Sequence, residues 1–353
     1  MTREKLQQIK IRSRGNKLSL AAVFHFVRPQ TEGEAMSDIK TQTRDGVDRR
    51  GMLKCMGWAG TGALFTLSGG LASSVALDTA LAQGINAKTA IKPLSFVQIS
   101  DTHVGFSKAA NPDPIATLRE TIAQIKSLPQ QPDFIVHTGD VTHLAKPDQF
   151  DLAHQVLSEL GLPIHFVPGE HDLVSGNDPS AFNARFGKDT LGDGWYSFDI
   201  GGVHFIGLIN VVQLGTSGMG TLGAAQLEWL KADLDGRSSS TPIVILSHFP
   251  LWPLFPEWGW GTQDAAAAYS LLARFGSVTA LNGHIHQIQR KVEGHMQFHA
   301  ARSTAYPQPA PGVGPGPGPL VVPADQLRAN IGISSLSLTM VDSPIAITDV
   351  PLA

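Results

Sequence analysis

Carboxylate and imidazole side chains follow five predicted β-strands, at the point where each strand ends. In chain order these groups are Asp101-Thr102-His103, Gly139-Asp140, Gly169-Glu170-His171-Asp172, Ser247-His248 and Asn282-Gly283-His284-Ile285-His286. The carboxyl ends of strands line the ligand crevice of an α/β sheet, so we expect the five groups to converge in space. None of them supplies a thiolate, and carboxylate and imidazole ligands together suit divalent ions such as Mn, Fe, Zn or Ni.

The number of candidate ligands indicates two ions rather than one. About eight ligands exceed the four of a tetrahedral ion, but they fit two ions that share a bridging carboxylate. Two ions about 3.5–4 Å apart are the arrangement for in-line displacement at phosphorus. Each group alone is weak evidence, because Gly-Asp is common in turns and a lone histidine such as His248 is common in cores and on surfaces. Five such groups, each at the end of a strand, predict a metal centre.

The order of these motifs resembles the calcineurin-like metallophosphoesterase superfamily, from Asp101 to His286. That family has Asp-x-His, Gly-Asp, Gly-Asn-His-Asp/Glu, a lone His and Gly-His-x-His in the same order. The resemblance implies a four-layer α/β/β/α sandwich with two metal ions. It assigns one ion to Asp101, His103, Asp140 and His286. It assigns the other ion to Asp140, Glu170, His248 and His284, so that Asp140 bridges the two.

The same resemblance implies a hydrolase that acts on phosphoric ester bonds. A metal-bridging hydroxide is the expected nucleophile, because two cations lower the pKa of bound water. His171 would protonate the leaving alkoxide or stabilise the phosphoryl oxygens, with Asp172 orienting its ring. The expected substrate is a phosphomonoester or phosphodiester, with nucleotides and cyclic nucleotides as candidates. The short motifs resemble the bacterial cyclic-nucleotide phosphodiesterase branch more than the protein phosphatases.

One position departs from the family pattern. The third motif usually has Asn where this chain has Glu170, which adds a charge and a methylene group. A carboxylate can still bind a metal ion, so we expect Glu170 to be a ligand. A degenerate, inactive site is the alternative at this position. For the whole protein, the alternative is a non-catalytic metal- or ligand-binding protein that retains the fold.

Further residues near these motifs have two interpretations each. His143 stands where the purple acid phosphatases place a metal-binding tyrosine, which argues against that branch; it is either a support for the metal ligands or an ordinary loop histidine. His137 is expected to be a buried, hydrogen-bonded histidine. Trp252, Trp258 and Trp260 either form an aromatic wall for the substrate or pack among themselves. Two other sites are candidates to contact phosphate oxygens: Asn210 and Arg302-Ser303-Thr304.

The elements that must position these groups alternate between apolar strands and amphipathic segments. The predicted strands span 94–100, 134–138, 163–167, 196–200, 203–210, 243–247 and 278–281. The predicted helices span 114–128, 149–160, 224–234 and 264–275, the first with Pro114 in its first turn. Residues 307–319 are rich in Pro and Gly and predict an exposed loop. Two alternating segments, 334–340 and 345–350, follow it.

Composition and charge exclude several classes of protein. The chain has 353 residues, 16% charged and 42% hydrophobic, which is typical of a globular protein. From residue 84 onward, fifteen Lys and Arg stand against 23 Asp and Glu. This acidic balance lacks the basic stripe of a dedicated nucleic-acid binder. The single cysteine, Cys55, excludes an intramolecular disulfide framework and a thiolate metal cluster.

The first 82 residues are typical of an export signal. A basic region with the pair Arg49-Arg50 precedes an uncharged stretch over 55–77, and Ala80-Leu81-Ala82 supplies a small-residue cleavage site. The arginine pair resembles a twin-arginine signal. A membrane anchor is the alternative, because an uncharged run of about 20 residues can span a bilayer. The Gly, Ser and Thr content of this run makes it a poor anchor.

We therefore expect three parts in the chain. Residues 1–35 are an over-long N-terminal extension, since Met36 begins a leader of more usual length. Residues 36–82 are a twin-arginine-type signal peptide, and 83–353 form the metallophosphoesterase domain, a size that one α/β domain fills. The mature protein is expected in the periplasm or outside the cell, and at the membrane if the signal is not cleaved. Its expected partners are the export machinery and a small-molecule phosphate ester.

Overall fold

The computed structural model describes residues 59–60, 63–68, 71–76, 93–175, 177–338 and 345–352. The chain divides into two units, Met1–Gly84 and Ile85–Ala353. The first unit contains an antiparallel sheet of β1 (Ala59–Gly60), β2 (Ala63–Ser68) and β3 (Leu71–Ala76). The expected extension 1–35 and the arginine pair of the expected signal lie outside the described residues. No helix in the described ranges is long and apolar enough to cross a membrane.

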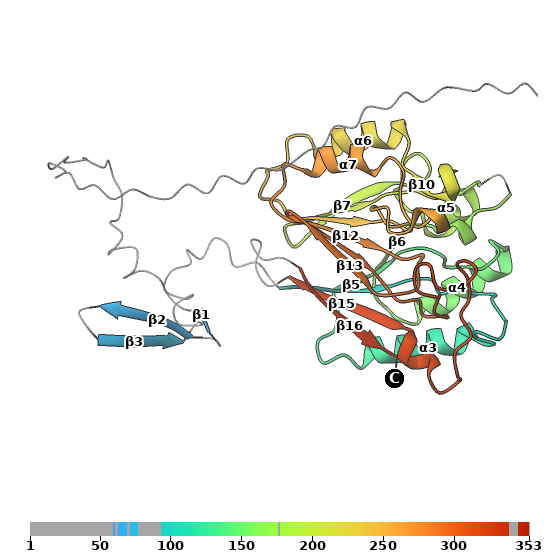
Figure 1. Cartoon of the computed structure of the whole chain (residues 1–353), viewed down its shortest axis with the longest axis horizontal. Coiled ribbons are helices and arrows are strands. Elements are labelled where there is room, and N and C mark those ends of the chain that lie inside the picture. Colours follow the sequence, from blue (N-terminus) through green and yellow to red (C-terminus); the bar gives the residue numbers. More distant parts are fainter. Residues whose placement is uncertain are drawn as a thin grey trace, which may run out of the picture. The chain divides into compact units, whose positions relative to one another are not determined.

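The second unit contains two mixed sheets (Figure 1). The five-stranded sheet has the order β16 (Ala346–Pro351), β15 (Gly332–Leu338), β4 (Leu94–Ile99), β5 (Phe134–His137) and β6 (Ile164–Phe166). The six-stranded sheet has the order β13 (Gln289–Glu293), β14 (Met296–Ala300), β12 (Val278–Asn282), β11 (Ile243–Leu246), β8 (Val203–Gly207) and β7 (Tyr196–Ile200). Strands β4, β5 and β6 are parallel, as are β14, β12, β11 and β8. Their carboxyl ends therefore lie along one edge of each sheet.

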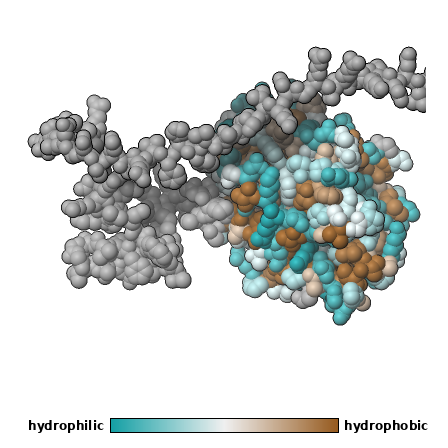
Figure 2. All heavy atoms as spheres, viewed as in Figure 1, coloured by the Kyte–Doolittle hydropathy of each residue, from teal (hydrophilic) through white to brown (hydrophobic). Residues whose placement is uncertain are grey.

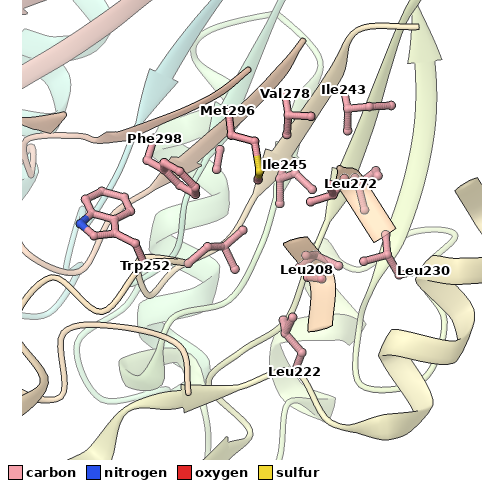
Figure 3. Packing of buried hydrophobic residues seen from close by; sticks show 14 of the residues in the cluster. Leu208, Leu222, Leu230, Ile243, Ile245, Trp252, Leu272, Val278, Met296 and Phe298 are labelled. Carbon is pink, nitrogen blue, oxygen red and sulfur yellow. The ribbon is translucent and has the colours of Figure 1, made fainter. Parts of the chain in front are cut away.

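Alternating side chains of the central strands define the layers. In β11, Ile243 and Ile245 pack under the helices α6 (Ala224–Leu234) and α7 (Ala265–Leu272), with Leu230 and Leu272 (Figure 3). Val244 and Leu246 of the same strand face the other sheet, where they join a cluster with Phe96 and Phe134 of β4 and β5. This alternation is the period-two pattern of a strand that is buried on both faces.

The outer face of the five-stranded sheet is covered in the same way. Helices α3 (Pro114–Lys126) and α4 (Pro147–Ser158) place Leu118, Ile122 and Phe150 against Val97 and Ile99 of β4. Three apolar layers thus separate two helical and two sheet layers, which confirms the predicted four-layer α/β/β/α sandwich. Figure 2 shows hydrophilic residues over much of one face, with hydrophobic residues in small groups between them.

The predicted elements are present, with ends that differ by a few residues. The sequence does not predict the hairpin of β13 and β14, because β13 reads Gln-Arg-Lys-Val-Glu and has no apolar face. Helix α5 (Ser180–Phe186) is a further element without a sequence prediction. The Pro/Gly-rich residues 307–319 form a loop as predicted, which the Leu320 amide closes by donating to the Pro307 carbonyl at 2.8 Å. The conformation of residues 307–319 therefore depends on turns and not on a periodic pattern of apolar residues.

Candidate metal centre

The five predicted groups meet at the carboxyl ends of the parallel strands. Asp101 and His103 follow β4, Asp140 follows β5, and Glu170, His171 and Asp172 follow β6. His248 follows β11, and His284 and His286 follow β12. The two sheets thus supply ligands from opposite sides of one site, as the positions of the motifs predict.

The backbone is strained at most of these positions. Five of the nine non-glycine residues with positive φ in the described ranges are Asp101, His103, Asp140, His284 and His286. The left-handed conformation costs an L-residue about 1–2 kcal/mol, and such strain gathers at functional sites. Strands β4, β5 and β12 are therefore each followed by a turn in which the polar residue is in the left-handed conformation.

The glycines of the motifs make room for the ligands. Gly139 has a φ of 97°, and a Cβ atom there would lie 2.3 Å from Nδ1 of His248. A Cβ atom at Gly169 would lie 2.1 Å from Oδ1 of Asp140. No side chain fits at either distance, so both motifs require glycine for close packing, and Gly139 alone of the two also requires it for its positive φ.

A first cluster contains Asp101, His103, Asp140 and His286, with ligand atoms all within 4.8 Å of one another. Nε2 of His286 lies 3.2 Å from Oδ1 of Asp101 and 3.2 Å from Nε2 of His103. Nε2 of His103 lies 3.5 Å from Oδ2 of Asp140. All four residues are buried. These are the residues that the family resemblance assigns to one metal ion.

A second cluster contains Glu170, His248 and His284. Oε2 of Glu170 lies 2.9 Å from Nε2 of His248, and Oε1 lies 3.0 Å from Nδ1 of His284. Nε2 of His248 is also 3.4 Å from Oδ2 of Asp140, which places Asp140 beside both clusters. Within the described residues, Glu170 Oε2, His248 Nε2 and His284 Nδ1 are buried with no well-directed hydrogen bond. Ligand atoms that converge in this way without a well-directed hydrogen bond between them fit a cation.

The surrounding hydrogen bonds orient two of the histidines. Nδ1 of His286 donates to the Tyr306 carbonyl at 2.6 Å, and Nδ1 of His248 donates to the Thr138 carbonyl at 2.7 Å. A carbonyl only accepts, so the network assigns the ring proton to Nδ1 in both residues. The Nε2 lone pairs then face the clusters, as in histidines that bind metal ions.

The charges in the site indicate which side chains carry a proton before a cation binds. Burial opposes ionisation of Glu170, but His284 and His248 hold its pKa well below the usual range. Burial, and then His286, lower the pKa of His103 well below 6.5, which keeps this ring neutral. Burial opposes protonation of His248, but Asp140 and Glu170 raise its pKa well above 6.5. A cation at the second cluster must therefore displace a proton from His248.

His171 lies beside the clusters and lines the adjoining cavity. Its backbone amide donates to Oδ1 of Asp140 at 2.9 Å, and its Nδ1 donates to the His143 carbonyl at 2.8 Å. Burial opposes protonation of the ring, but Asp140 and Glu170 outweigh burial and raise its pKa above 6.5. A protonated imidazole beside the clusters is suited to protonating a leaving group.

The expected role of Asp172 is wrong, because its carboxylate does not orient the His171 ring. Oδ2 of Asp172 accepts from the amides of Val141 and Gly169, both at 3.0 Å. Oδ1 accepts from the amide of Thr142 at 2.7 Å and from its hydroxyl at 2.9 Å. Burial, and then the charge of Asp140, raise the pKa of Asp172 to about 7. Asp172 instead joins the loops that follow β5 and β6.

A cavity of about 240 Å³ opens beside both clusters. Its wall includes Phe106, Lys108, Trp258, Tyr306 and Gln308. Each of the two interpretations of the aromatic loop holds for part of it. Trp252 and Trp260 are buried in the core under α6 and α7, whereas Trp258 lines the cavity. Only one of the three indoles is therefore placed to contact a ligand of this cavity.

Most of the remaining candidate residues are buried and bind neighbouring loops. His137 is buried and bonded to Thr102 and to the Gly139 amide, as predicted. Asn210 does not reach the cavity, because its buried amide group binds the backbone of Phe249 and the hydroxyl of Thr262. Ser303 and Thr304 are also buried, and the Ser303 hydroxyl donates to the Asp101 carbonyl at 2.7 Å. These residues support the loops around the clusters.

The sequence predicts no role for Tyr306, and it allows two interpretations of His143. The Tyr306 ring stacks on His103 with ring centroids 4.9 Å apart, and its carbonyl orients His286. No motif marks Tyr306, which only precedes the Pro/Gly-rich loop. His143 lines the cavity and contacts His103, and burial followed by the neighbouring His171 lowers its pKa to about 4. It is therefore no ordinary loop histidine.

Comparisons with known proteins agree on the family. A sequence model of the calcineurin-like phosphoesterases matches residues 94–288. A 3',5'-cyclic-nucleotide phosphodiesterase of Nostoc sp. is 26% identical in an alignment of 222 residues that covers 61% of this chain and 79% of that protein. A serine/threonine-protein phosphatase of Mus musculus is 29% identical in an alignment of 180 residues that covers 45% of this chain and 57% of that protein. The match thus spans less than two thirds of the mouse protein.

Solved structures agree on the fold. A dimetal phosphatase from Danio rerio superimposes with a TM-score of 0.55 at 16% identity, over 74% of this chain and 96% of that one. A purple acid phosphatase from yellow lupin seeds superimposes with a TM-score of 0.56 at 14% identity, over 74% of this chain and 52% of that one. At these identities the likeness establishes the sandwich fold alone.

Proposed function

The chain belongs to the calcineurin-like phosphoesterase family and is a hydrolase of phosphoester bonds, and on that premise we propose that it is an exported enzyme that uses two metal ions to hydrolyse a small phosphate ester. One ion would be held by Asp101, His103, Asp140 and His286. The other would be held by Asp140, Glu170, His248 and His284. The proposal makes Asp140 the ligand common to both.

The position of Asp140 between the two clusters carries this proposal. Its Oδ2 lies 3.5 Å from Nε2 of His103 in the first cluster and 3.4 Å from Nε2 of His248 in the second. When bound, two cations would lower the pKa of water toward neutrality and stabilise charge on the phosphoryl oxygens. The chain supplies the carboxylates and oriented lone pairs that hold them.

His171 supplies the proton for the leaving group in this proposal. Its Nδ1–H is held by the His143 carbonyl, which leaves Nε2 as the ring atom available to an ester in the cavity. The carboxylates of Asp140 and Glu170 favour the protonated ring. A protonated imidazole that presents Nε2–H to the ester is suited to act as a general acid.

The cavity supports a small substrate. About 240 Å³ accommodates a phosphate group with part of a small organic molecule. The indole of Trp258 and the ring of Phe106 offer apolar walls, and Lys108 offers a cation. Two relatives, from Nostoc sp. and Psychrobacter sp., are named as a known and a probable cyclic nucleotide phosphodiesterase. We therefore take nucleotides, including cyclic nucleotides, as the first substrates to test.

The test is a screen of metals and substrates. Metal-free protein is supplied with Mn, Zn, Fe or Ni and assayed with bis(p-nitrophenyl) phosphate, p-nitrophenyl phosphate and 3',5'-cyclic AMP. We expect turnover with at least one metal, and its loss in Asp140→Asn. Two tightly bound metals without turnover of any ester would instead favour a non-catalytic binding protein.

Glu170 provides a test of substrate charge. Two divalent ions with the carboxylates of Asp101, Asp140 and Glu170 leave a formal charge of +1, whereas Asn at position 170 leaves +2. Changing the site by one charge, at about 5 Å from the phosphate in a medium of dielectric constant about 80, changes the interaction energy with each phosphate charge by about 0.8 kcal/mol. We expect Glu170→Asn to raise the ratio of monoesterase to diesterase rates roughly fourfold, because the monoester carries the larger negative charge. The exposed Glu228→Gln is the matched control, and an unchanged ratio contradicts the charge argument.

Export is the second part of the proposal, and it rests on the sequence around Arg49 and Arg50. The twin-arginine route carries folded proteins, so the metal ions would load before transport. Changing both arginines to lysine should leave the precursor in the cytoplasm, as measured by cell fractionation and immunoblotting. N-terminal sequencing of the periplasmic form should begin near residue 83. A double variant that still reaches the periplasm would contradict this route.

A further inference from the structure

His143 occupies a position between two groups that the proposed function uses. It follows β5, three residues after Asp140, and its Nδ1 lies 3.3 Å from Nδ1 of His103. Its ring stacks on that of His171, with centroids 4.8 Å apart and planes 17° apart. Phe106 contacts the same ring edge-on, with centroids 5.1 Å apart. The ring is thus held on three sides.

The contact between His103 and His143 fixes the tautomers of both rings. Nε2 of His103 faces Asp140 and His286 in the first cluster. A lone pair on Nε2 requires the ring proton on Nδ1, which then donates to Nδ1 of His143. His143 must accept through Nδ1, so its own proton lies on Nε2. His248 and His286 are oriented by carbonyls, whereas His103 relies on another imidazole.

The backbone carbonyl of His143 contacts the proposed acid, and its ring lines the cavity. Its carbonyl accepts from Nδ1 of His171 at 2.8 Å, so one residue contacts both a proposed ligand and the proposed acid. The ring is partly exposed and lines the cavity with Lys108. With Nδ1 engaged by His103, Nε2–H is the donor that the ring presents to a phosphate oxygen.

We propose that the two nitrogens of His143 have separate roles: Nδ1 positions His103 for metal binding, and Nε2–H binds the phosphate group in the cavity. The inference rests on the proposed function, since the phosphate is that of the ester. It makes His143 a positioning residue toward the first cluster and a substrate-binding residue toward the cavity.

Another use of the same atoms is a third metal ion. His103, His143 and His171 offer nitrogens within 4.8 Å of one another. That use requires Nδ1 of His103 to lose its proton, and Nδ1 of His171 is already bonded to a carbonyl. The hydrogen bonds therefore favour the positioning role, and metal stoichiometry distinguishes the two.

Two substitutions separate the roles of the nitrogens. Asn places an oxygen where Nδ1 stands, so His143→Asn keeps an acceptor for His103 but lacks the Nε2–H donor. Gln places its amide near Nε2, so His143→Gln keeps a donor to the cavity but lacks the acceptor. His143→Phe keeps the stacking and lacks both. The exposed His154→Gln on α4 is the control for changing a histidine elsewhere.

The measurements use the full chain without metal and then with Mn²⁺ or Zn²⁺. By calorimetry, Mn²⁺ affinity at one site should fall about 10–100-fold in His143→Gln, as for other partners of metal-binding histidines, and stay within about threefold of the parent in His143→Asn. The affinity of the Mn²⁺ form for inorganic phosphate should fall in His143→Asn and stay close to that of the parent in His143→Gln. In the Zn²⁺ form, ¹⁵N spectra should show a proton on Nδ1 of His103.

Three results would overturn the inference. Equal Mn²⁺ affinity in the Asn and Gln variants would show that His103 does not depend on the acceptor. A third equivalent of Mn²⁺ that is lost in His143→Phe would make His143 a ligand. Phosphate affinity unchanged in His143→Asn would remove the donor role. None of these measurements depends on turnover. An inactive protein would therefore contradict the proposed function without deciding the roles of His143.

Discussion

Replacing Asp172 by asparagine tests whether this carboxylate joins the two loops that carry Asp140 and Glu170. The fully buried carboxylate accepts four hydrogen bonds, two at each oxygen. An amide keeps one oxygen and turns the other into a donor. The least costly orientation points the new NH₂ group at Thr142, whose hydroxyl can reverse and accept, but whose backbone N–H then has no acceptor.

The expected cost follows from these contacts. One buried N–H without an acceptor costs about 1–3 kcal/mol, and the remaining bonds lose charge assistance worth about 1 kcal/mol. We therefore expect Asp172→Asn to lower the free energy of unfolding by about 2–4 kcal/mol. Urea denaturation of the metal-free chain at about pH 8.5, above the Asp172 pKa of about 7, measures it with the carboxylate ionised. The exposed Asp235→Asn should change it by less than about 0.5 kcal/mol.

The same variant should also weaken metal binding at both clusters. The loop amides bonded to Asp172 flank Asp140 and Glu170, and the His171 amide that follows donates to Asp140. A loss of stability below about 0.5 kcal/mol, with Mn²⁺ affinity unchanged, would refute this reasoning. An effect confined to turnover of esters with poor leaving groups would instead restore the original idea that Asp172 acts through His171.

Three further predictions concern the site and the fold. Asp140→Asn should weaken both metal sites together in a Mn²⁺ titration, and two tight sites in that variant would show that Asp140 is not shared. His171→Ala should lower turnover about 10²–10⁴-fold with metal content unchanged, and less for p-nitrophenolate esters; an equal loss for all leaving groups would indicate phosphate positioning instead. Burial lowers the pKa of His165, stacked on Phe198, to about 4. The neutral ring therefore contributes stability that is complete above about pH 6.5 and is lost as the pH falls toward 4; His165→Phe should flatten this part of the urea-midpoint profile, and an unchanged slope would contradict it.

The strands and the ligands are features that the sequence encodes locally. Buried strands such as β5 and β11 are short apolar runs, and the polar residue that follows each run is visible in the sequence. Parallel pairing then brings these residues to one edge without further information. This is why residues as distant as Asp101 and His286 could be predicted to converge.

The partners of those ligands are not encoded in this way. His248 and His286 are oriented by the carbonyls of Thr138 and Tyr306, and every residue has a carbonyl, so nothing marks these two. The role of Asp172 depends on the path of two loops that pass close together. The sequence also places Trp258 and Trp260 two residues apart, but only the turn between them sends one to the cavity and the other to the core.

The most direct test of a shared, dinuclear centre is the rate of bis(p-nitrophenyl) phosphate hydrolysis as a function of bound Mn²⁺. Metal-free protein is titrated, and bound metal and initial rate are measured on the same samples. We expect a rate that stays low over the first equivalent and rises over the second, with saturation at two ions per chain. Full activity at one equivalent, or two bound ions without activity, would contradict it.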